Sequence, residues 1–211
     1  MKTKQKVFDY RALRLSLGII AFALPIVVSL VARVELPSIS ASYHSAARDV
    51  FVGLLFIVVS FLWAYNGHTL TEARLSKLAA IGALVTALSP TACNTCVVDW
   101  RSNLHYIGAA SLFLILTYFC YGPFQERTKG QGGKRERRSR IYLASGTVML
   151  LCIITMGLAK FTLPTETVQT LRLTYWAEAI ALWAFGVAWI TSGKVLSPLV
   201  EADEVLKLKL L

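Results

Sequence analysis

Charged residues are scarce in this chain, at 16% of its 211 residues, whereas hydrophobic residues make up 55%. A soluble domain carries nearer a quarter charged residues. The few charges also avoid six apolar stretches, each close to the roughly 20 residues that a helix needs to cross a bilayer. These stretches are 15–34, 44–65, 70–89, 104–121, 141–159 and 173–190. We therefore predict an all-α, polytopic membrane protein with six transmembrane helices, because helices satisfy their own backbone polar groups in lipid.

The net charge of +10 does not indicate a nucleic-acid partner, because of where the basic residues lie. If the N-terminus is cytoplasmic, 17 of the 22 Lys and Arg residues fall in inside segments and 5 in outside segments. This positive-inside bias determines orientation. The pattern predicts a single membrane domain over 1–211, arranged in three hairpins with both termini cytoplasmic. The predicted cytoplasmic segments are 1–14, 122–140 and 193–211, and the expected location is the plasma or inner membrane of a bacterial cell.

Several signatures of catalysis and transport are also missing. The chain has no phosphate-binding glycine loop, no G-x-S-x-G and no H-E-x-x-H. Pro25 is the only proline inside a predicted span, whereas transporters are typically built with paired interrupted helices. The first span is longer than the 7–15 apolar residues of a secretory signal. We therefore expect an uncleaved first helix, although Ser38 and Ser40 precede Ala41 at a cleavage-like spacing.

Glu178 is the most costly polar residue in the predicted spans. It lies six residues after Arg172, which places it about 9 Å deeper along a helix. An ionisable residue within a span indicates a functional site by default. The alternative is a structural carboxylate that pairs with Arg48 or Arg172, because a buried charge must be compensated.

The chain has only three histidines, and two of them begin spans that run inward from the outer face. Two imidazoles and one carboxylate, with an open position for water, would suit zinc, which makes bound water a hydrolytic nucleophile. We predict that His44 and His105 bind this metal. Glu178 or Asp49 would then be the third ligand or the general base, and Ser40 would orient or polarise the substrate. The alternative is that these residues form a structural hydrogen-bond network.

Ser40-x-x-x-His44, at the start of the second span, resembles the first motif of the CREST superfamily. That superfamily includes alkaline ceramidases and the progestin and adiponectin receptors. The resemblance implies a helical bundle with zinc held by three histidines, a serine and an aspartate, and hydrolysis of lipid amides. This chain departs from the family in having six predicted spans instead of seven and no His-x-x-x-His in the last span. The overall pattern is also similar to small bacterial six-helix membrane proteins.

Two functions follow from these residues. The first is a lipid-directed, metal-dependent hydrolase. The second is a non-catalytic accessory, assembly or lipid-binding membrane protein. Membrane lipids are the expected partners in either case, and both a homo-oligomer and a larger membrane complex are compatible with a chain of this size. The relative positions of His44, His105 and Glu178 discriminate between the two functions.

The four cysteines give a separate signal. Cys93 and Cys96 form a C-x-x-C in an outer loop. This motif resembles the quinone-linked thiol oxidases of the DsbB and vitamin K epoxide reductase type, but those enzymes need a second cysteine pair in another outer loop, and this chain has none. In an oxidising compartment we therefore predict a local disulfide between Cys93 and Cys96, with half of a metal site as the alternative. We expect Cys120 and Cys152 to be packing residues.

The inner loop 122–140 combines glycines with a run of basic residues. Like charges beside a membrane orient the chain. Each also attracts anionic lipid with about 1 kcal/mol. The run therefore predicts both a topology determinant and a headgroup-binding cluster, made of Lys134, Arg135, Arg137 and Arg138.

Overall fold

The computed structural model describes residues 10–92 and 100–204, and every regular element within them is helical. The six long helices are α1 (Tyr10–Ala32), α2 (Arg48–Ala64), α3 (Leu70–Leu88), α4 (Trp100–Phe119), α5 (Gly133–Thr162) and α7 (Leu173–Ser192). The short elements are the 3-10 helices η1 (Ser40–His44) and η3 (Ser197–Leu199), the π-helix η2 (Cys120–Phe124) and α6 (Thr165–Thr170). The all-α prediction is confirmed.

Four of the long helices are long and apolar enough to cross a membrane: α1, α4 together with η2, α5 and α7. The helix α2 is shorter, with 17 residues. The first turns of α3 carry Glu72, Arg74 and Lys77, and these charges lower its mean hydropathy. The four apolar helices identify an integral membrane protein.

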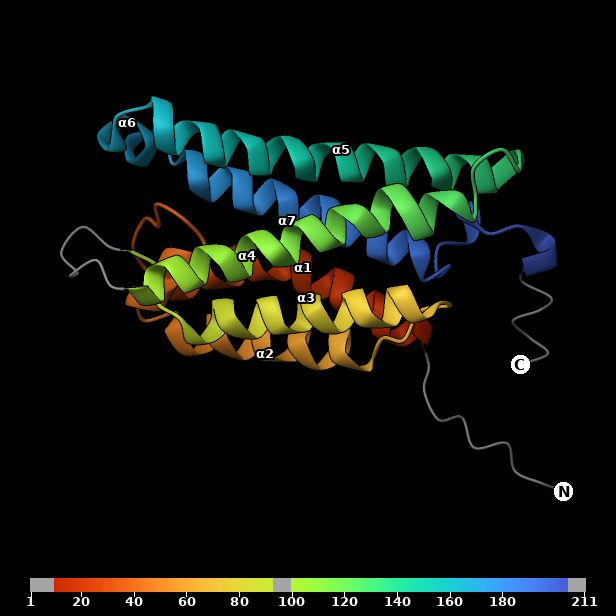
Figure 1. Cartoon of the computed structure of the whole chain (residues 1–211), viewed down its shortest axis with the longest axis horizontal. Coiled ribbons are helices and arrows are strands. Elements are labelled where there is room, and N and C mark those ends of the chain that lie inside the picture. Colours follow the sequence, from red (N-terminus) through yellow and green to blue (C-terminus); the bar gives the residue numbers. More distant parts are fainter. Residues whose placement is uncertain (1–9, 93–99, 205–211) are drawn as a thin grey trace, which may run out of the picture.

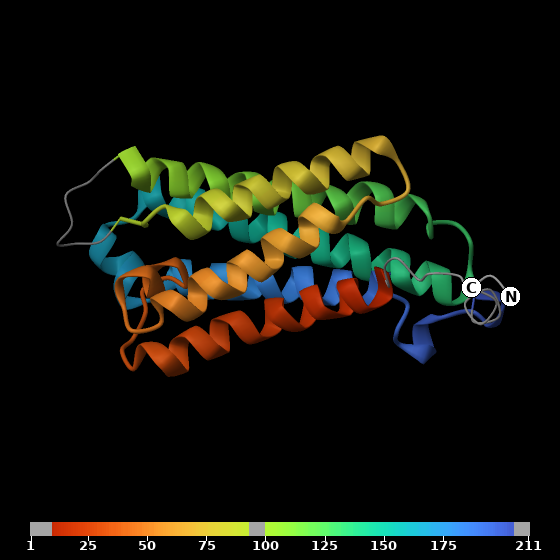
Figure 2. The ribbon, with the colours of Figure 1, turned by 90° about the horizontal axis from the view of Figure 1, so that it is seen from below.

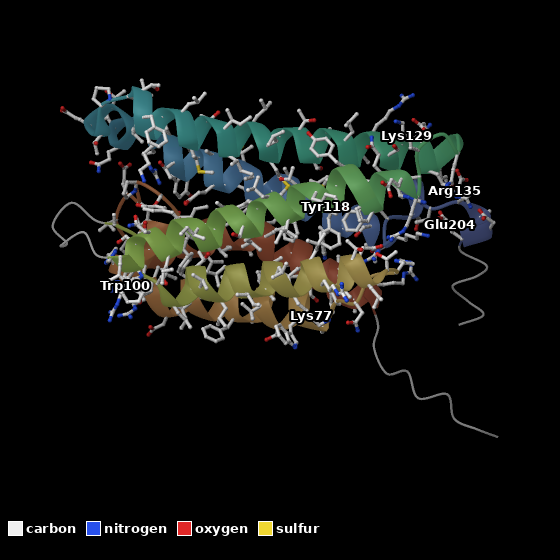
Figure 3. The ribbon with its side chains drawn as sticks, viewed as in Figure 1. Lys77, Trp100, Tyr118, Lys129, Arg135 and Glu204 are labelled. Carbon is white, nitrogen blue, oxygen red and sulfur yellow. The ribbon has the colours of Figure 1, made fainter. Side chains whose placement is uncertain are left out.

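The long helices form a closed ring in chain order, in which each packs on the next and α7 returns to α1. They run side by side along one axis in two perpendicular views (Figure 1, Figure 2). One end of the bundle, which we call the η1 end, holds η1, α6 and the start of α4. The other end, which we call the basic end, holds the 65–69 turn, the 125–132 connection and the 193–204 segment. Figure 3 labels Trp100 at the η1 end and Lys129, Arg135 and Glu204 at the basic end.

The basic end is built by arginines that bind helix-terminal carbonyl groups. Arg14 donates to the carbonyl oxygen of Ser192 at 2.6 Å, and Arg11 donates to that of Lys194 at 2.5 Å. The last carbonyl groups of a helix have no partner within the helix, so Arg14 satisfies one at the end of α7, and Arg11 binds the chain just beyond it. At the start of α3, the Thr69 hydroxyl accepts from the Glu72 backbone N–H, a capping interaction that defines where the helix begins.

Small residues allow two pairs of helices to approach closely. A Cβ atom added to Gly108 of α4 would lie 2.8 Å from the carbonyl oxygen of Gly82 on α3. A Cβ atom added to Gly186 of α7 would lie 2.8 Å from the ring of Phe22 on α1. Close approach through small residues is the usual packing mode of transmembrane helices. These contacts fix α3 against α4 and α7 against α1, and they leave α4 and α5 as a separate interface.

Candidate functional site

A cavity of about 550 Å³ lies at the η1 end, between α4, α5, α6 and α7. It exists because α4 and α5 lie close together at the basic end and diverge toward the η1 end (Figure 1). Its volume is within the range of about 300–1,000 Å³ that is usual for small-molecule sites. The connection 37–41 and the end of the α3–α4 connection at Thr91 and Ala92 complete its wall.

The lining of this cavity changes from apolar to polar along the bundle axis. Phe113 and Ile153 line the part nearest the bundle centre, and Lys160 and Thr174 line the part nearest the η1 end. Ile153 and Lys160 are seven residues apart on α5, or about 10 Å. The cavity therefore has an apolar region and a polar region that lie about as far apart as the apolar and polar parts of one amphiphilic molecule.

The cavity opens between α4 and α5 onto the outer surface of the bundle. Tyr106 and Leu163 both line it and are also 40% and 42% exposed. Lys160 bridges the two helices at this opening, because its Nζ lies 4.5 Å from the centre of the Tyr106 ring.

His105 lines the cavity and is only 1% exposed. Its Nδ1 donates to the carbonyl oxygen of Ser89 at 2.9 Å. His44 acts in the same way from η1, since its Nε2 donates to the carbonyl oxygen of Thr91 at 2.7 Å. A carbonyl oxygen only accepts, so each of these nitrogens carries a proton. Both histidines thus satisfy carbonyl groups just beyond the end of α3. The Nε2 of His105 has no hydrogen-bond partner in the described part of the chain.

Glu178 also lines the cavity, and it binds the start of η1. Its Oε2 accepts from the backbone N–H of Ile39 at 2.5 Å and from that of Ser40 at 3.3 Å, and its Oε1 accepts from the Ser40 hydroxyl at 3.1 Å. The first N–H groups of a helix have no partner within the helix. Glu178 supplies that partner from a helix distant in the sequence.

The two arginines considered as partners of Glu178 have other contacts. Arg48 donates to the Tyr43 hydroxyl at 3.0 Å and lies over the same ring. Arg172 donates to the carbonyl oxygen of Leu36 at 3.0 Å. The carboxylate of Glu178 is therefore compensated by N–H and O–H donors of the 39–40 segment, and not by the ion pair that was the alternative to a functional site.

Ser40 and His44 do not act together, although four residues separate them. They lie on η1, a 3-10 helix with three residues per turn, in which residues three apart share a face. Ser40 is buried against Glu178, whereas His44 is exposed and binds the α3–α4 connection. Asp49 is exposed in the first turn of α2, where a negative charge interacts favourably with the helix dipole. Asp49 does not line the cavity.

The positions of these side chains determine whether they can share a zinc ion. In the described residues, no group of three or more His, Cys, Asp or Glu side chains is placed to hold a metal ion. A structural or catalytic zinc ion needs at least three protein ligands. The residues of the predicted cluster are all described and do not form such a group, and zinc binding stays a prediction for metal analysis.

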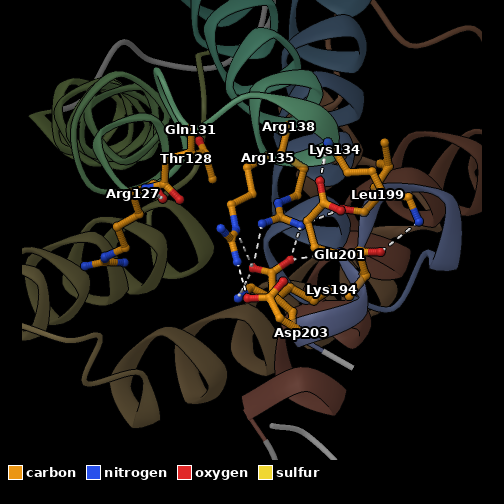
Figure 4. A network of polar contacts seen from close by, with 12 residues as sticks. Arg127, Thr128, Gln131, Lys134, Arg135, Arg138, Lys194, Leu199, Glu201 and Asp203 are labelled. Atoms are coloured by element: carbon orange, nitrogen blue, oxygen red, sulfur yellow. Dashed lines mark hydrogen bonds and ion pairs between the residues drawn. The ribbon is translucent and has the colours of Figure 1, made fainter. Parts of the chain in front are cut away.

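The remaining predicted residues fall into two groups. Cys93 and Cys96 lie outside the described residues, and Cys120 and Cys152 are buried and unpaired. In the basic run, Lys134, Arg135 and Arg138 contact the 194–204 segment (Figure 4), whereas Arg137 is exposed.

Sequence reasoning missed the residues that shape the cavity on α5 and α6. Lys160, Tyr106, Gly157 and Gln169 all line the cavity, and the sequence pattern assigns none of them to a site. A lysine directly after an apolar span was the one available signal, because the sequence does not show which helix it faces.

Comparisons of the chain with protein families, with curated proteins and with solved structures find no match.

Proposed function

We propose that this protein is a non-catalytic membrane protein that binds a bilayer lipid in the cavity between α4 and α5. The observation that carries the proposal is the cavity itself, with its apolar region at Phe113 and Ile153 and its polar region at Lys160 and Thr174. Ligand sites are mostly apolar, with a few polar groups that orient the ligand. A lipid would place its acyl chain in the first region and its headgroup at the second.

The non-catalytic assignment rests on the contacts of the polar side chains. His44, His105 and Glu178 each hold a backbone group at a helix end. In lipid, a backbone group without a partner costs several kcal/mol. These side chains therefore have a structural task that accounts for their presence at membrane depth.

The proposal includes a topology with six spans and both ends in the cytoplasm. Large apolar side chains are exposed on α2 and α3 as well, such as Trp63 at 55% and Ile81 at 47%, and a bilayer would cover them. The cations cluster at the basic end, which the positive-inside bias assigns to the cytoplasm. The cavity then lies in the outer leaflet of the membrane.

Filling the cavity tests the proposal. A Cβ atom at Gly157 meets nothing within 4 Å, although this residue lines the cavity. Gly157→Leu should therefore fold normally and occupy the space of the ligand. Gly53→Leu is the matched control, because Gly53 also has open space around it but lies on α2.

The measurement is photo-crosslinking in nanodiscs that contain a phosphatidylcholine with a diazirine in its acyl chain. In wild type and Gly53→Leu, we expect peptides containing Phe113 and Ile153 to be labelled more strongly than the peptide containing Leu30, which is 73% exposed on α1. In Gly157→Leu, this excess should disappear. Equal labelling in all three proteins would show that the cavity does not hold lipid.

A lipid-directed hydrolase is the second candidate. One observation favours it: His105, whose Nε2 has no hydrogen-bond partner among the described residues, and the carboxylate of Glu178 line the same cavity. Metal analysis and a lipid-hydrolysis assay on wild type and His105→Ala would test it. Stoichiometric zinc and turnover that both depend on His105 would favour the hydrolase over the binding protein.

A further inference from the structure

The basic run of α5 lies at the depth of lipid headgroups. The helix has 30 residues, so it is about 45 Å long. A bilayer with its headgroup regions is about 40–45 Å thick. The apolar part of α5 begins at Ile141, which leaves residues 133–140 at headgroup level on the basic end.

An acidic segment of the same chain covers part of this run. Arg138 is 1% exposed and donates from Nη1 and Nη2 to the two carboxylate oxygens of Glu204, both at 2.8 Å. Lys194 donates to Glu204 at 2.8 Å. Arg135 pairs with Asp203, and its Nε lies 3.7 Å from Glu204. Figure 4 shows Arg135 and Arg138 of α5 pointing toward the 194–204 segment, where Lys194 and Asp203 are labelled.

The first turn of α5 receives a third carboxylate. Glu201 accepts from the backbone N–H of Lys134 at 2.5 Å, and the Nζ of Lys134 donates to the carbonyl oxygen of Val200 at 2.9 Å. Free N–H groups at a helix N-terminus are a site for carboxylate or phosphate groups. The forked donors of an arginine likewise match either group. Residues 201–204 thus use the donors that a lipid phosphate would use.

We infer that the acidic segment 201–204 and the headgroup of an anionic phospholipid compete for Lys134, Arg135 and Arg138. Arg137 and Arg140 are exposed on the same turns, so they can attract the headgroup while the segment is docked. Binding of the headgroup by the other three side chains then requires the segment to leave. This inference is independent of the cavity, which lies at the opposite end of the bundle.

Hydrogen exchange of the full-length protein in nanodiscs tests this competition. The two membranes are pure phosphatidylcholine and phosphatidylcholine with phosphatidylglycerol. In the neutral membrane, the amides of 199–204 should be protected by the docked contacts. In the anionic membrane, they should exchange faster, while the core of α7 remains unchanged. Equal or stronger protection in the anionic membrane would overturn the inference.

A pair of single-charge variants provides the second test. Glu204→Gln removes the buried carboxylate, and Glu126→Gln removes an exposed carboxylate at the same end with the same change in net charge. A basic side chain released from its carboxylate contributes about 1 kcal/mol to the binding free energy of anionic lipid. Native mass spectrometry should therefore show about fivefold tighter phosphatidylglycerol binding for Glu204→Gln. Glu126→Gln should bind like wild type.

Glu204→Gln leaves Arg138 buried without its carboxylate, which destabilises a protein. Asp203→Asn is therefore the second variant, because Asp203 is 56% exposed and pairs with Arg135. It should bind phosphatidylglycerol more tightly than Glu126→Gln. If Asp203→Asn and Glu126→Gln bind this lipid equally, the segment does not compete with headgroups.

Discussion

Single polar residues at the η1 end satisfy backbone groups of segments that are distant in the sequence. His44 and His105 donate to carbonyl groups beyond α3, and Glu178 accepts from N–H groups at the start of η1. In a soluble protein, water forms hydrogen bonds with such groups, but water is absent from the hydrocarbon region of a membrane. Side chains of a membrane protein must take over this task where a chain turns at membrane depth.

Glu178→Ala should destabilise the protein by about 2–3 kcal/mol, because hydrogen bonds to a charged group are among the stronger ones. Thermal unfolding in detergent measures this, and hydrogen exchange should be faster in 39–44. The control is Glu35→Ala, which removes an exposed carboxylate from the same connection and should change stability by less than about 0.5 kcal/mol. Equal effects of the two variants would contradict the capping role of Glu178.

The ion pairs of Glu204 predict that docking of the 199–204 segment at the basic end depends on pH. Partial burial alone would raise the pKa of Glu204, but hydrogen bonds from Arg138 and Lys194 outweigh it and lower the pKa to about 2. A carboxyl group with a depressed pKa stabilises the folded state above its ordinary pKa, near 4.5, and this contribution is lost as the pH falls toward the lowered value.

We therefore expect the 199–204 segment to stay docked at pH 5 and to loosen between about pH 4.5 and 2. A fluorophore attached at the exposed Lys129, with a quencher on the 201–204 segment, would report the separation. Glu204→Gln should remove most of this transition. A transition centred above pH 5 would show that another group controls docking.

At the scale of helices, close packing is unevenly distributed around the ring. Gly82 and Gly108 bring α3 onto α4, and Gly18 and Gly186 bring α1 onto α7. The cavity opens at the interface of α4 with α5, where α4 and α5 diverge. The rigid contacts hold α4 from one side and leave its other side free to border a ligand.

Gly108→Ala should lower stability by about 1–3 kcal/mol, the usual cost of overpacking, because its Cβ atom would lie 2.8 Å from the Gly82 carbonyl oxygen. Gly53→Ala, with open space around it, should be neutral or slightly stabilising. Midpoints of thermal unfolding in one detergent compare the two. An unfolding midpoint of Gly108→Ala equal to that of wild type would mean that α3 and α4 can move apart without loss of stability.

At the scale of the whole molecule, the two ends differ in charge and in task. The basic end holds most of the described cations and the docked acidic segment, whereas the η1 end holds the cavity. This polarity agrees with a protein that has one face in the cytoplasm and one face outside. The proposed lipid site and the proposed headgroup site then belong to opposite leaflets.

Cysteine labelling in intact cells tests this orientation. In a cysteine-free background, Thr165→Cys on α6 should react with an impermeant maleimide, and Gly132→Cys in the 125–132 connection should react only after the cells are opened. Both residues are exposed, so access across the membrane is the only difference. The reverse pattern would place the cavity in the inner leaflet.

The sequence predicted the helices well and the site only in part. All six predicted stretches are helical, but the second helix begins at Arg48 and not at His44, because residues 40–44 form a separate 3-10 helix. That difference separates Ser40 from His44, the two residues that carry the resemblance to the CREST motif. His105 and Glu178 do line one cavity, as expected from their common position at the η1 end.

Composition and charge alone predict the membrane class and the positions of the long helices. Both follow from properties summed along neighbouring residues, since burial in lipid depends on a local stretch of apolar side chains. The cavity, the partners of Glu178 and the pairing of Arg138 with Glu204 were decided only by tertiary structure. Each joins residues far apart in the chain, and one sequence does not show which faces of two helices meet or where those helices diverge.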